Sequence, residues 1–278
     1  MIVVTGAKGV IGSAVVAQLL ARGIEVIAIS REVFDLSKGN DLASYISKKP
    51  EVIIHLAAAV PHSARYPDTN ESALLTRSID NCVLNAVNKW NCRVIYASTC
   101  SLYDKRSNYV MFEDSPLLVR AESQYMKTKS EGEAIFAKSK SYAILRVPAP
   151  IGPGLPKSVV AKQFFDLATV HQSIRIWGSG KREQNYVDVG DIASAMINAA
   201  YSKVNGVFNI AANAPTTMIS LAMTIVAVVG KGSIEFADNP DPLEYENARY
   251  SNRRAHDLLS WSPKISLKDS IKSMQEFK

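Results

Sequence analysis

Two side chains that could transfer a proton, Tyr125 and Lys129, lie four residues apart in a segment whose pattern predicts a helix over residues 124–138. Residues four apart share one face of a helix. A free tyrosine has a pKa of about 10, and we expect the Lys129 ammonium to lower the pKa of Tyr125 by about 1–3 units. Tyr125 could then exchange a proton with a substrate oxygen. The alternative is that both are surface residues of an ordinary helix.

A third candidate, Thr99, follows a buried strand predicted at residues 93–97. Its hydroxyl could hydrogen-bond the reacting oxygen, or it could only cap the loop. Cys100 comes next in the chain, and we expect a packed thiol there rather than a reactive one.

The chain begins with an apolar strand at residues 2–4 that leads into Gly6, Gly9 and Gly12. Gly6 permits a tight turn from strand to helix, Gly9 lets the backbone approach a pyrophosphate, and Gly12 lets the helix pack closely on the strand. The helix predicted over residues 10–21 directs the free N–H groups of its first turn at the phosphates. Together with the tyrosine–lysine pair, this order of elements predicts a nicotinamide cofactor. Lys129 would also hold the nicotinamide ribose.

The second predicted strand ends at Ser30 and Arg31, without the acid that would bind the ribose 2′-hydroxyl of NAD. Arg31 and Lys8 could instead contact the 2′-phosphate of NADP, because cations complement a dianionic phosphate. We therefore favour NADP; if both cations are only exposed surface residues, either cofactor binds. Asp35 and Leu36 would close a very short third strand, where Asp35 could touch the adenine amino group or cap the next turn.

The first half of the chain alternates strands and helices, which predicts a doubly wound parallel sheet with helices on both faces. Ligands bind beyond the carboxyl ends of the strands in such sheets. Residues 187–200 and 207–210 are expected to return to the sheet, so the substrate half is a cap made of two separated segments. Other strands are expected at residues 24–29, 52–57, 142–147 and 175–177, and other helices at 42–47, 74–90, 159–169, 220–230 and on both sides of Pro263.

The composition is that of an ordinary globular chain, with 278 residues of which 47% are hydrophobic and 21% charged. The sequence has no apolar run of about 18 residues and no signal-peptide pattern, so we expect no membrane segment. Its three cysteines lack metal-binding spacing, so we expect no metal site and a reducing cytoplasm. The formal charge of +6 is spread along the chain, which favours a solvated surface over a nucleic-acid partner.

Several motifs occur in one order along the whole chain: TGAKGVIG, HLAAAV, YASTCSLYD, YMKTKSEGEAIF, LRVPAPIGPG, WGSGKREQNYVDVGDIASAM and LLSWSPKISLKDSI. They resemble the extended short-chain dehydrogenase/reductase family of NAD(P)-dependent sugar epimerases, dehydratases and reductases. The resemblance implies an α/β fold with a Rossmann-like sheet and a small discontinuous α/β substrate-binding cap. It places a dinucleotide-binding domain at residues 1–150, to which 186–213 return, and the cap at 151–185 and 214–278.

The resemblance also implies the roles of individual residues and a homodimer that pairs through the helices at 74–90 and 124–138. The expected catalytic residues are Tyr125, Lys129 and Thr99. The expected cofactor contacts are Gly6, Lys8, Gly9, Val10, Ile11, Gly12, Ser30, Arg31, Asp35, Leu36, Leu56, Ala57, Ala58 and Lys129. The expected substrate contacts are Thr99, Cys100, Ser101, Ala149, Arg182 and Gln184.

Two features narrow the activity within this family. Dehydratases carry an Asp-Glu pair after the active-site threonine, where this chain has Cys100 and Ser101. The short connection over residues 30–36 and the basic Lys8 resemble the NADP-linked 4-keto-sugar reductases.

Three positions depart from the family pattern, one of which is Gly190 in place of the first acid of the usual Val-Asp-Asp. Ala149 replaces an asparagine, and Gln184 replaces the arginine that clamps the nucleotide diphosphate, so Arg182, Lys157 or Lys162 would have to compensate.

Three hypotheses follow. The leading one is an oxidoreductase or epimerase acting on a nucleotide-activated sugar, most of all a reductase of a 4-keto-6-deoxy sugar. The second keeps the chemistry but uses a free sugar acid or another small carbonyl compound, as the missing arginine suggests. The third is a cofactor-sensing regulatory protein on the same scaffold, which a broken tyrosine–lysine pair would indicate; the pair is intact.

Overall fold

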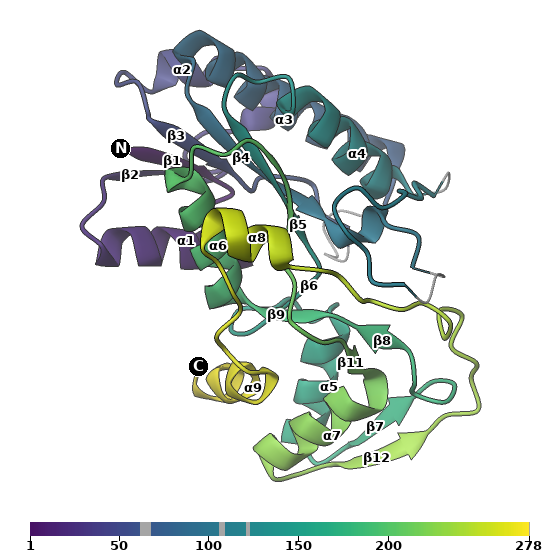
Figure 1. Ribbon diagram of the computed structural model, residues 1–278. Coiled ribbons are helices and arrows are strands. Elements are labelled where there is room, and N and C mark those ends of the chain that lie inside the picture. The colour runs from purple at the N-terminus through teal and green to yellow at the C-terminus, as the bar shows by residue number, and fades with distance from the viewer. Residues whose placement is uncertain (62–67, 106–108, 121–122, 278) are drawn as a thin grey trace.

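The computed structural model describes residues 1–61, 68–105, 109–120 and 123–277, which form a larger lobe around a sheet and a smaller lobe beside it (Figure 1). Within the described residues the main sheet has six strands, in the order β10 (Gly206–Asn209), β5 (Tyr142–Val147), β4 (Arg93–Thr99), β3 (Val52–His55), β1 (Ile2–Thr5) and β2 (Val26–Ile29). All neighbouring strands of this sheet run parallel. The predicted α/β fold class is therefore confirmed.

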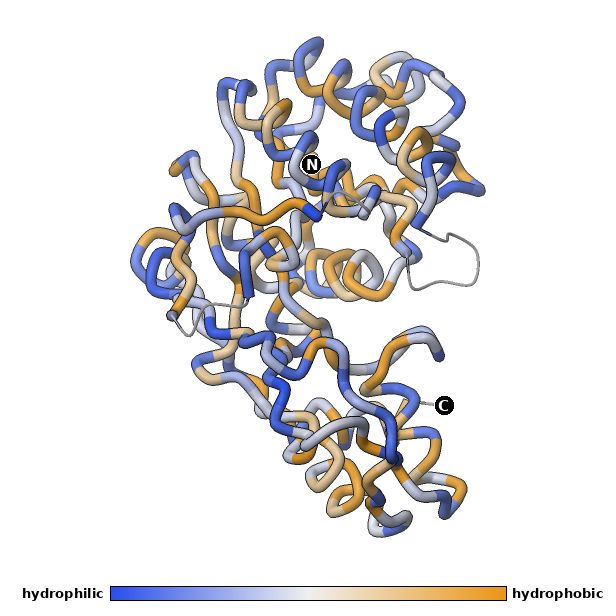
Figure 2. The backbone as a smooth tube through the Cα atoms, turned by 90° about the vertical axis from the view of Figure 1, so that its right-hand side faces the viewer, coloured by the Kyte–Doolittle hydropathy of each residue, from blue (hydrophilic) through white to orange (hydrophobic). Residues whose placement is uncertain are grey.

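The sheet is buried on both faces because successive side chains of each strand point to opposite sides. Val4 and Ile54 face one hydrophobic cluster, whereas Val3 and Ile53 face the other. The first cluster is covered by α1 (Val10–Ala21), α6 (Val189–Tyr201) and α8 (Arg253–Leu259), and the second by α2 (Leu42–Tyr45), α3 (Asn70–Trp90) and α4 (Gln124–Phe136). Viewed from the side, hydrophobic and hydrophilic segments alternate along these helices (Figure 2).

The local signals in the sequence locate most elements of this lobe. The helix predicted over residues 10–21 and the strand predicted over 142–147 coincide with α1 and β5. Helix α3 begins earlier than the expected residue 74, because Thr69 and Ser72 form a capping box in which the Thr69 hydroxyl accepts from the Ser72 N–H at 3.3 Å.

The smaller lobe has its own core. Its helices are α5 (Val160–Thr169), α7 (Met218–Val229) and α9 (Leu267–Glu276). Its strands form the pairs β7 (Ser173–Ile176) with β12 (Ser233–Phe236), β8 (Glu183–Gln184) with β11 (Thr216–Thr217), and β6 (Ala149–Ile151) with β9 (Tyr186–Asp188). Phe165, Leu221 and Ile271 are buried together there. The expected helices near 159–169 and 220–230 are thus present, and they pack the lobe.

Two expectations about the strands are wrong. Asp35 and Leu36 do not close a third strand: the Asp35 carboxylate accepts from the Ser37 N–H at 3.0 Å and caps the 3₁₀ helix η1 (Leu36–Lys38). Residues 187–200 return to the larger lobe mainly as helix α6, which begins where the Asp188 carboxylate accepts from the Gly190 N–H at 2.6 Å. Of the strands after β5 that the structure describes, β10 alone joins the main sheet.

The tail differs from the expected cap at residues 214–278. Its helices α8 and α9 lie on either side of Pro263, as the sequence predicts. However, α8 and Trp261 pack in the larger lobe, where the indole Nε1–H donates to the Asp191 carbonyl at 2.9 Å. The remaining domain boundaries stay a prediction.

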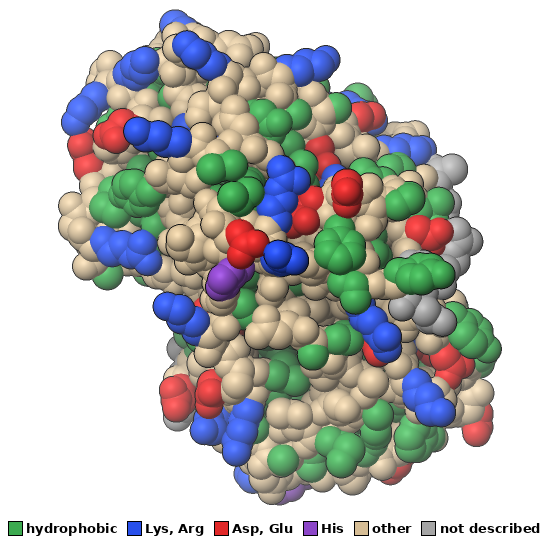
Figure 3. All heavy atoms as spheres, viewed as in Figure 1, with side chains coloured by type: hydrophobic (Ala, Val, Ile, Leu, Met, Phe, Trp, Pro, Cys, Tyr) green, Lys and Arg blue, Asp and Glu red, His purple; other side chains and the backbone are tan. Residues whose placement is uncertain are grey.

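The surface shows no concentration of one charge on the face in Figure 3, where Lys and Arg side chains are dispersed among other groups. In the part of the chain that the structure describes, no helix is long and apolar enough to cross a membrane. Within the same residues, no three His, Cys, Asp or Glu side chains are grouped so that they could hold a metal ion.

Candidate active site

The glycine loop between β1 and α1 depends on the missing side chains of two glycines. Gly6 has φ of +66°, and a Cβ there would lie 2.8 Å from the backbone nitrogen of Ala57. A Cβ on Gly12 would overlap the carbonyl oxygen of Gly6. Any larger residue would therefore push α1 away from the loop. Both positions behave as the sequence predicts.

The first turn of α1 is open toward a ligand. Gly9 is the N-cap and offers no side-chain hydrogen bond, and the turn contains no acidic residue. The N–H groups of this turn and the positive end of the helix dipole are therefore available to phosphate oxygens. Val10 and Ile11 belong to this turn. The geometry fits a pyrophosphate. Among the described residues, no side chain caps this turn in its place.

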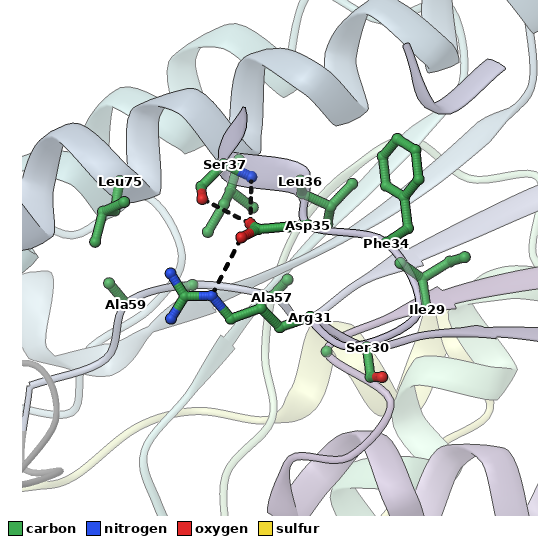
Figure 4. A pocket seen from close by; sticks show the side chains of 13 residues that line it. Ile29, Ser30, Arg31, Phe34, Asp35, Leu36, Ser37, Ala57, Ala59 and Leu75 are labelled. Atoms are coloured by element: carbon green, nitrogen blue, oxygen red, sulfur yellow. Dashed lines mark hydrogen bonds and ion pairs between the residues drawn. The ribbon is translucent and has the colours of Figure 1, made fainter. Parts of the chain in front are cut away.

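A pocket opens beside the loop, at the carboxyl ends of β1, β2 and β3 (Figure 4). The predicted cofactor contacts that line it are Gly6, Ser30, Arg31, Asp35, Leu36, Ala57 and Ala58. Phe34, Leu75 and Ile79 also line it, and sequence reasoning missed them. The Ser30 hydroxyl is buried and has no hydrogen-bond partner among the described residues. An apolar slot with an unsatisfied hydroxyl fits the adenosine part of a dinucleotide.

The two expected phosphate-binding cations each contact an acid. Arg31 Nε lies 3.4 Å from Asp35 Oδ2, so the guanidinium lies along the pocket wall (Figure 4). Lys8 forms an ion pair with Glu32 across the loop. The hydrogen bond from Ser37 is the main cause of a lowered pKa at Asp35, with Arg31 contributing. Asp35 therefore caps η1 and orients Arg31, so the capping alternative describes it better than an adenine contact does.

Tyr125 and Thr99 meet at the carboxyl end of β4. The Thr99 hydroxyl accepts from the Ser101 N–H at 3.0 Å, and it is also hydrogen-bonded to the Tyr125 hydroxyl. Thr99 therefore caps the loop, and its contact with a reacting oxygen stays a prediction. The Thr99 hydroxyl keeps one hydrogen and a second lone pair, so it can either donate to the Tyr125 hydroxyl or accept from it.

The pKa of Tyr125 differs from expectation. Burial raises it to about 12, and the Thr99 hydrogen bond offsets only part of that rise. Lys129 does not lower it, because its ammonium is directed elsewhere: Nζ donates to the Ala97 carbonyl at 2.7 Å and lies 4.7 Å from the centre of the Tyr96 ring. Burial lowers the pKa of Lys129 itself. Tyr125 is thus a protonated phenol at neutral pH.

Helix α4 is positioned by a residue that sequence reasoning missed. Asp68 accepts from the Tyr125 N–H at 2.7 Å and from the Ser123 hydroxyl at 3.0 Å. The carboxylate holds the first turn of α4 at the loop before α3, and it favours the positive end of the helix dipole. An acid far from a helix in sequence carries no local signal for this role.

The expected substrate contacts lie on both lobes. Cys100 is a packed thiol, as expected: it is buried, burial raises its pKa, and Sγ donates to the Arg146 carbonyl at 3.3 Å. Ser101 is half-buried in η2 (Cys100–Leu102), and Ala149 is half-buried on β6. Gln184 lies on β8, where it pairs with Thr216.

Two of the three basic residues that could replace the missing arginine already pair with an acid. Arg182 Nε lies 3.0 Å from Asp241 Oδ2 but makes no hydrogen bond among the described residues. Lys162 pairs with Asp166, four residues later in α5. Lys157 is exposed. Of the three, Arg182 is half-buried and its Nε–H makes no hydrogen bond among the described residues, so it is the strongest candidate.

Comparison with known proteins decides the family. The model of the NAD dependent epimerase/dehydratase family matches residues 2–211. The chain belongs to this family. The resemblance seen in the sequence is therefore confirmed, together with an enzyme that uses a nicotinamide cofactor.

Members of the family with several activities resemble the chain over nearly its full length. A UDP-glucose 4-epimerase from Mycolicibacterium smegmatis is 27% identical, covering 99% of this chain and 97% of the relative. A dTDP-4-dehydro-6-deoxy-D-allose reductase from a Streptomyces species is 23% identical, covering 94% and 91%. The crystal structure of the UDP-glucose 4-epimerase of Thermotoga maritima with UDP-glucose superposes with a TM-score of 0.86 at 24% identity, covering 99% and 97%. The likeness to the Thermotoga maritima structure supports the fold alone.

In this family setting the residues divide the work along one edge of the main sheet, where the carboxyl ends of its strands lie. The glycine loop and the pocket are suited to hold the pyrophosphate and adenosine of the dinucleotide, which supplies a hydride when bound. Thr99 and Tyr125 can hydrogen-bond a substrate oxygen, and Tyr125 can give it a proton. Lys129 lies under this site, and Leu56 is half-buried at the end of β3 beside it.

Proposed function

We propose that this enzyme reduces the 4-keto group of a nucleotide-activated sugar, with a 4-keto-6-deoxy sugar as the substrate and NADPH as the hydride donor. The observation that carries the proposal is the hydrogen-bonded pair of Thr99 and Tyr125, in which the tyrosine pKa is about 12. A protonated phenol is the form that donates a proton to a ketone oxygen as a hydride arrives at the carbon.

The proposed reaction assigns one role to each residue. Thr99 and Tyr125 bind the ketone oxygen, which polarises the carbonyl bond. The hydride adds to the carbonyl carbon, and the phenolic proton of Tyr125 passes to the oxygen, so the ketone becomes a secondary alcohol. Lys129 holds the nicotinamide ribose. Cys100 and Ser101 offer no carboxylate, which is why we do not propose a dehydratase.

The preference for NADPH rests on Arg31 and Lys8. Arg31 lines the pocket and Lys8 lies in the glycine loop, and both contact an acid, Asp35 and Glu32 respectively. A 2′-phosphate carries more negative charge than a carboxylate, and it can recruit both cations at the end of β2. The 23% identical reductase named for a dTDP-4-dehydro sugar supports the same substrate class, and Arg182 is the cap residue suited to the diphosphate.

A 4-epimerase is the second candidate, and it is supported by the 27% identity to a UDP-glucose 4-epimerase. Such an enzyme oxidises and then reduces the same carbon, so the nicotinamide cofactor is restored within each turnover. The same tyrosine then acts first as a base and afterwards as an acid.

One experiment separates the two candidates. The purified enzyme is incubated with NADPH and with dTDP- or GDP-linked 4-keto-6-deoxy sugars, and the absorbance of the reduced nicotinamide is followed. We expect stoichiometric loss of NADPH and a product that has gained a hydride and a proton. If UDP-glucose is instead converted to UDP-galactose without net consumption of cofactor, the epimerase is correct and the reductase proposal fails.

The proposed homodimer would use α3 and α4. An ion pair between Arg77 and Glu131 joins the two helices at 2.7 Å within one subunit. Along α3 the exposed positions include Leu74 but also Ser78, Asn81 and Asn85. A mostly polar face favours a weak pair. Light scattering over a range of concentrations tests it, and a monomer at every concentration would exclude the dimer.

A further inference from the structure

A chain of buried polar side chains passes beneath the cofactor site. Thr5 Oγ1 lies 2.7 Å from His55 Nδ1, and His55 Nε2 lies 2.9 Å from Asp80 Oδ1. Tyr96 donates to the second oxygen of Asp80 at 3.3 Å. Each of these four residues is at most 3% exposed. They belong to β1, β3, α3 and β4, so the chain crosses the larger lobe.

Counting donors and acceptors sets the direction of each hydrogen bond. The Thr5 oxygen accepts from the N–H groups of Leu56 at 3.2 Å and Ala57 at 3.3 Å, which occupies both of its lone pairs. Its own hydrogen must therefore go to His55 Nδ1. The histidine hydrogen is then on Nε2 and goes to Asp80, which accepts again from Tyr96.

One end of this chain supports the glycine loop. Thr5 directly precedes Gly6, and the two N–H groups that it binds belong to the loop after β3. Gly6 and Ala57 face each other across the pocket, where even a Cβ on Gly6 would come within 2.8 Å of the Ala57 nitrogen. The hydroxyl of Thr5 thus holds the two walls of the pocket together.

The other end supports the helix that carries Tyr125. The Tyr96 ring lies 4.7 Å from Lys129 Nζ. Its hydroxyl occupies the place where a Cβ on Gly132 would be, so α4 packs directly on it. Asp80 orients that hydroxyl and adds a buried negative charge near Lys129.

We propose that His55 and Asp80 are positioning residues of the cofactor site: His55 supports the glycine loop through Thr5, and Asp80 acts on Lys129 through its buried charge. This inference rests on the proposed function only in that Lys129 holds the nicotinamide ribose. Neither residue touches cofactor or substrate in this role. Their effect is exerted through the Leu56–Ala57 backbone at one end and through the Lys129 ammonium at the other.

The charges around Lys129 give the proposal a measurable consequence. Burial lowers the pKa of Lys129, while Asp80 on α3 and Glu133 on α4 raise it. Tyr96 on β4 and Tyr125 on α4 also face this region, and burial raises the pKa of both phenols. Asp80 and Glu133 therefore favour the charged form of Lys129, against the effect of burial. Without the Asp80 charge, the ammonium loses its proton at a lower pH.

The decisive variant is Asp80→Asn, which keeps the shape of the side chain. NADPH and NADH are titrated into the protein at a series of pH values, and the fluorescence of the reduced nicotinamide reports binding. We expect the pH at which affinity is lost on the alkaline side to fall by about one unit. Tyr96→Phe keeps the ring under Lys129 and the Asp80 charge, and it should leave that pH unchanged. An alkaline limit that is the same in Asp80→Asn and in the unmodified protein would overturn the proposal.

A second variant tests the other end of the chain. His55→Phe removes both histidine hydrogen bonds, and we expect cofactor affinity to fall about tenfold and the amides of Leu56 and Ala57 to exchange faster with deuterated solvent. The matched control is His256→Phe, which breaks an exposed pair with Asp257 at 2.8 Å on α8 and should change neither. If His55→Phe lowers the melting temperature but leaves cofactor affinity unchanged, the chain is only structural.

Both tests use cofactor binding and need no sugar substrate. A failed search for a 4-keto-sugar reductase activity would therefore leave them intact. Conversely, a confirmed reductase whose Asp80→Asn variant binds cofactor normally would refute the positioning role alone.

Discussion

The cofactor side and the substrate side of this enzyme differ in whether the backbone or side chains form them. The cofactor side consists mainly of backbone: two glycines whose neighbours leave no room for a Cβ, an uncapped helix N-terminus and a slot between strand ends. The proposed substrate side depends on side chains: Thr99 and Tyr125 at the edge of the sheet and, on the cap, Arg182, which already pairs with Asp241.

This difference explains what each side can tolerate. A backbone site changes only if the fold changes, so its ligand is common to many proteins that share the fold. A side-chain site is altered by single substitutions, and its charges are released or neutralised by partners from distant parts of the chain. The identity of the cofactor class is therefore far better specified than the identity of the sugar.

The largest expected effect comes from the group on the boundary between the two sides. Tyr125→Phe removes the transferable proton but keeps the ring, so turnover should fall by about 10²–10⁴ while cofactor affinity changes little. Because the pKa of Tyr125 is raised to about 12, the group should stay protonated and the reduction rate should not depend on its titration near neutral pH. Steady-state rates on a confirmed substrate measure this.

The control for that variant is Tyr201→Phe, because Tyr201 is 59% exposed at the end of α6. Thr99→Val should reduce turnover less than Tyr125→Phe, since the hydroxyl orients rather than donates the proton. A loss below about threefold in Tyr125→Phe would remove the tyrosine from the mechanism.

The second effect tests the backbone side. In Gly12→Ala the new methyl group overlaps the Gly6 carbonyl, so α1 must move. We expect a loss of about 2 kcal/mol in the free energy of unfolding, a fall of about 5 °C in melting temperature, and cofactor binding weakened more than tenfold. Calorimetry and cofactor titration check this.

Gly23→Ala is the matched control for Gly12→Ala. Gly23 has φ of +70° but no atom within 4 Å of its missing Cβ. The left-handed conformation alone should cost about 1 kcal/mol, with cofactor affinity unchanged. Equal losses of cofactor affinity in the two variants would show that the close approach of α1 to the loop is unimportant.

The elements that could be predicted from the sequence are those whose determinants lie close together in the chain. Local patterns specified α1, β5 and the glycine loop because their determinants, apolar spacing and glycine positions, lie within a few residues. The third strand at Asp35 and Leu36 was wrong because the Asp35 carboxylate found a closer partner in Ser37. A sequence pattern can favour a strand over a turn. Here the conformation depended on the hydrogen bonds from Ser37 to the Asp35 carboxylate, which the pattern does not show.

Long-range partners were not predictable in this way. Asp68 holds Tyr125, and Asp80 accepts from His55, over separations of 57 and 25 residues. No spacing rule connects such positions. For the same reason the expected effect of Lys129 on the Tyr125 pKa was wrong. The helix places both side chains on one face, but the Lys129 ammonium donates its hydrogen bond to the Ala97 carbonyl.

A smaller effect is expected at the pocket mouth, where the two kinds of site meet. Arg31→Ala should remove most of a preference for NADPH that we expect to be at least tenfold, because a charge-assisted phosphate contact contributes about 1.5–3 kcal/mol. NADH affinity should be nearly unchanged. Glu32→Gln releases Lys8 from its ion pair and should move the preference in the opposite direction. Equal affinities of the unmodified enzyme for the two cofactors would exclude the assignment.

The smallest effect is expected on the cap, because its cations already have partners. Arg182→Met keeps most of the side-chain length but removes the charge, and we expect the KM of the nucleotide sugar to rise about threefold with kcat nearly unchanged. Loss of an unshared charge-assisted contact would raise it at least tenfold, but part of this contact is already given to Asp241 at 3.0 Å. Lys181→Met, at an exposed neighbouring position, is the matched control and should leave KM unchanged.

Asp241→Asn frees Arg182 and should lower KM for substrates that carry a diphosphate but not for a free sugar. If Arg182→Met instead reduces kcat and leaves KM alone, the arginine does not bind the nucleotide, and the free-sugar hypothesis becomes the better account of the cap.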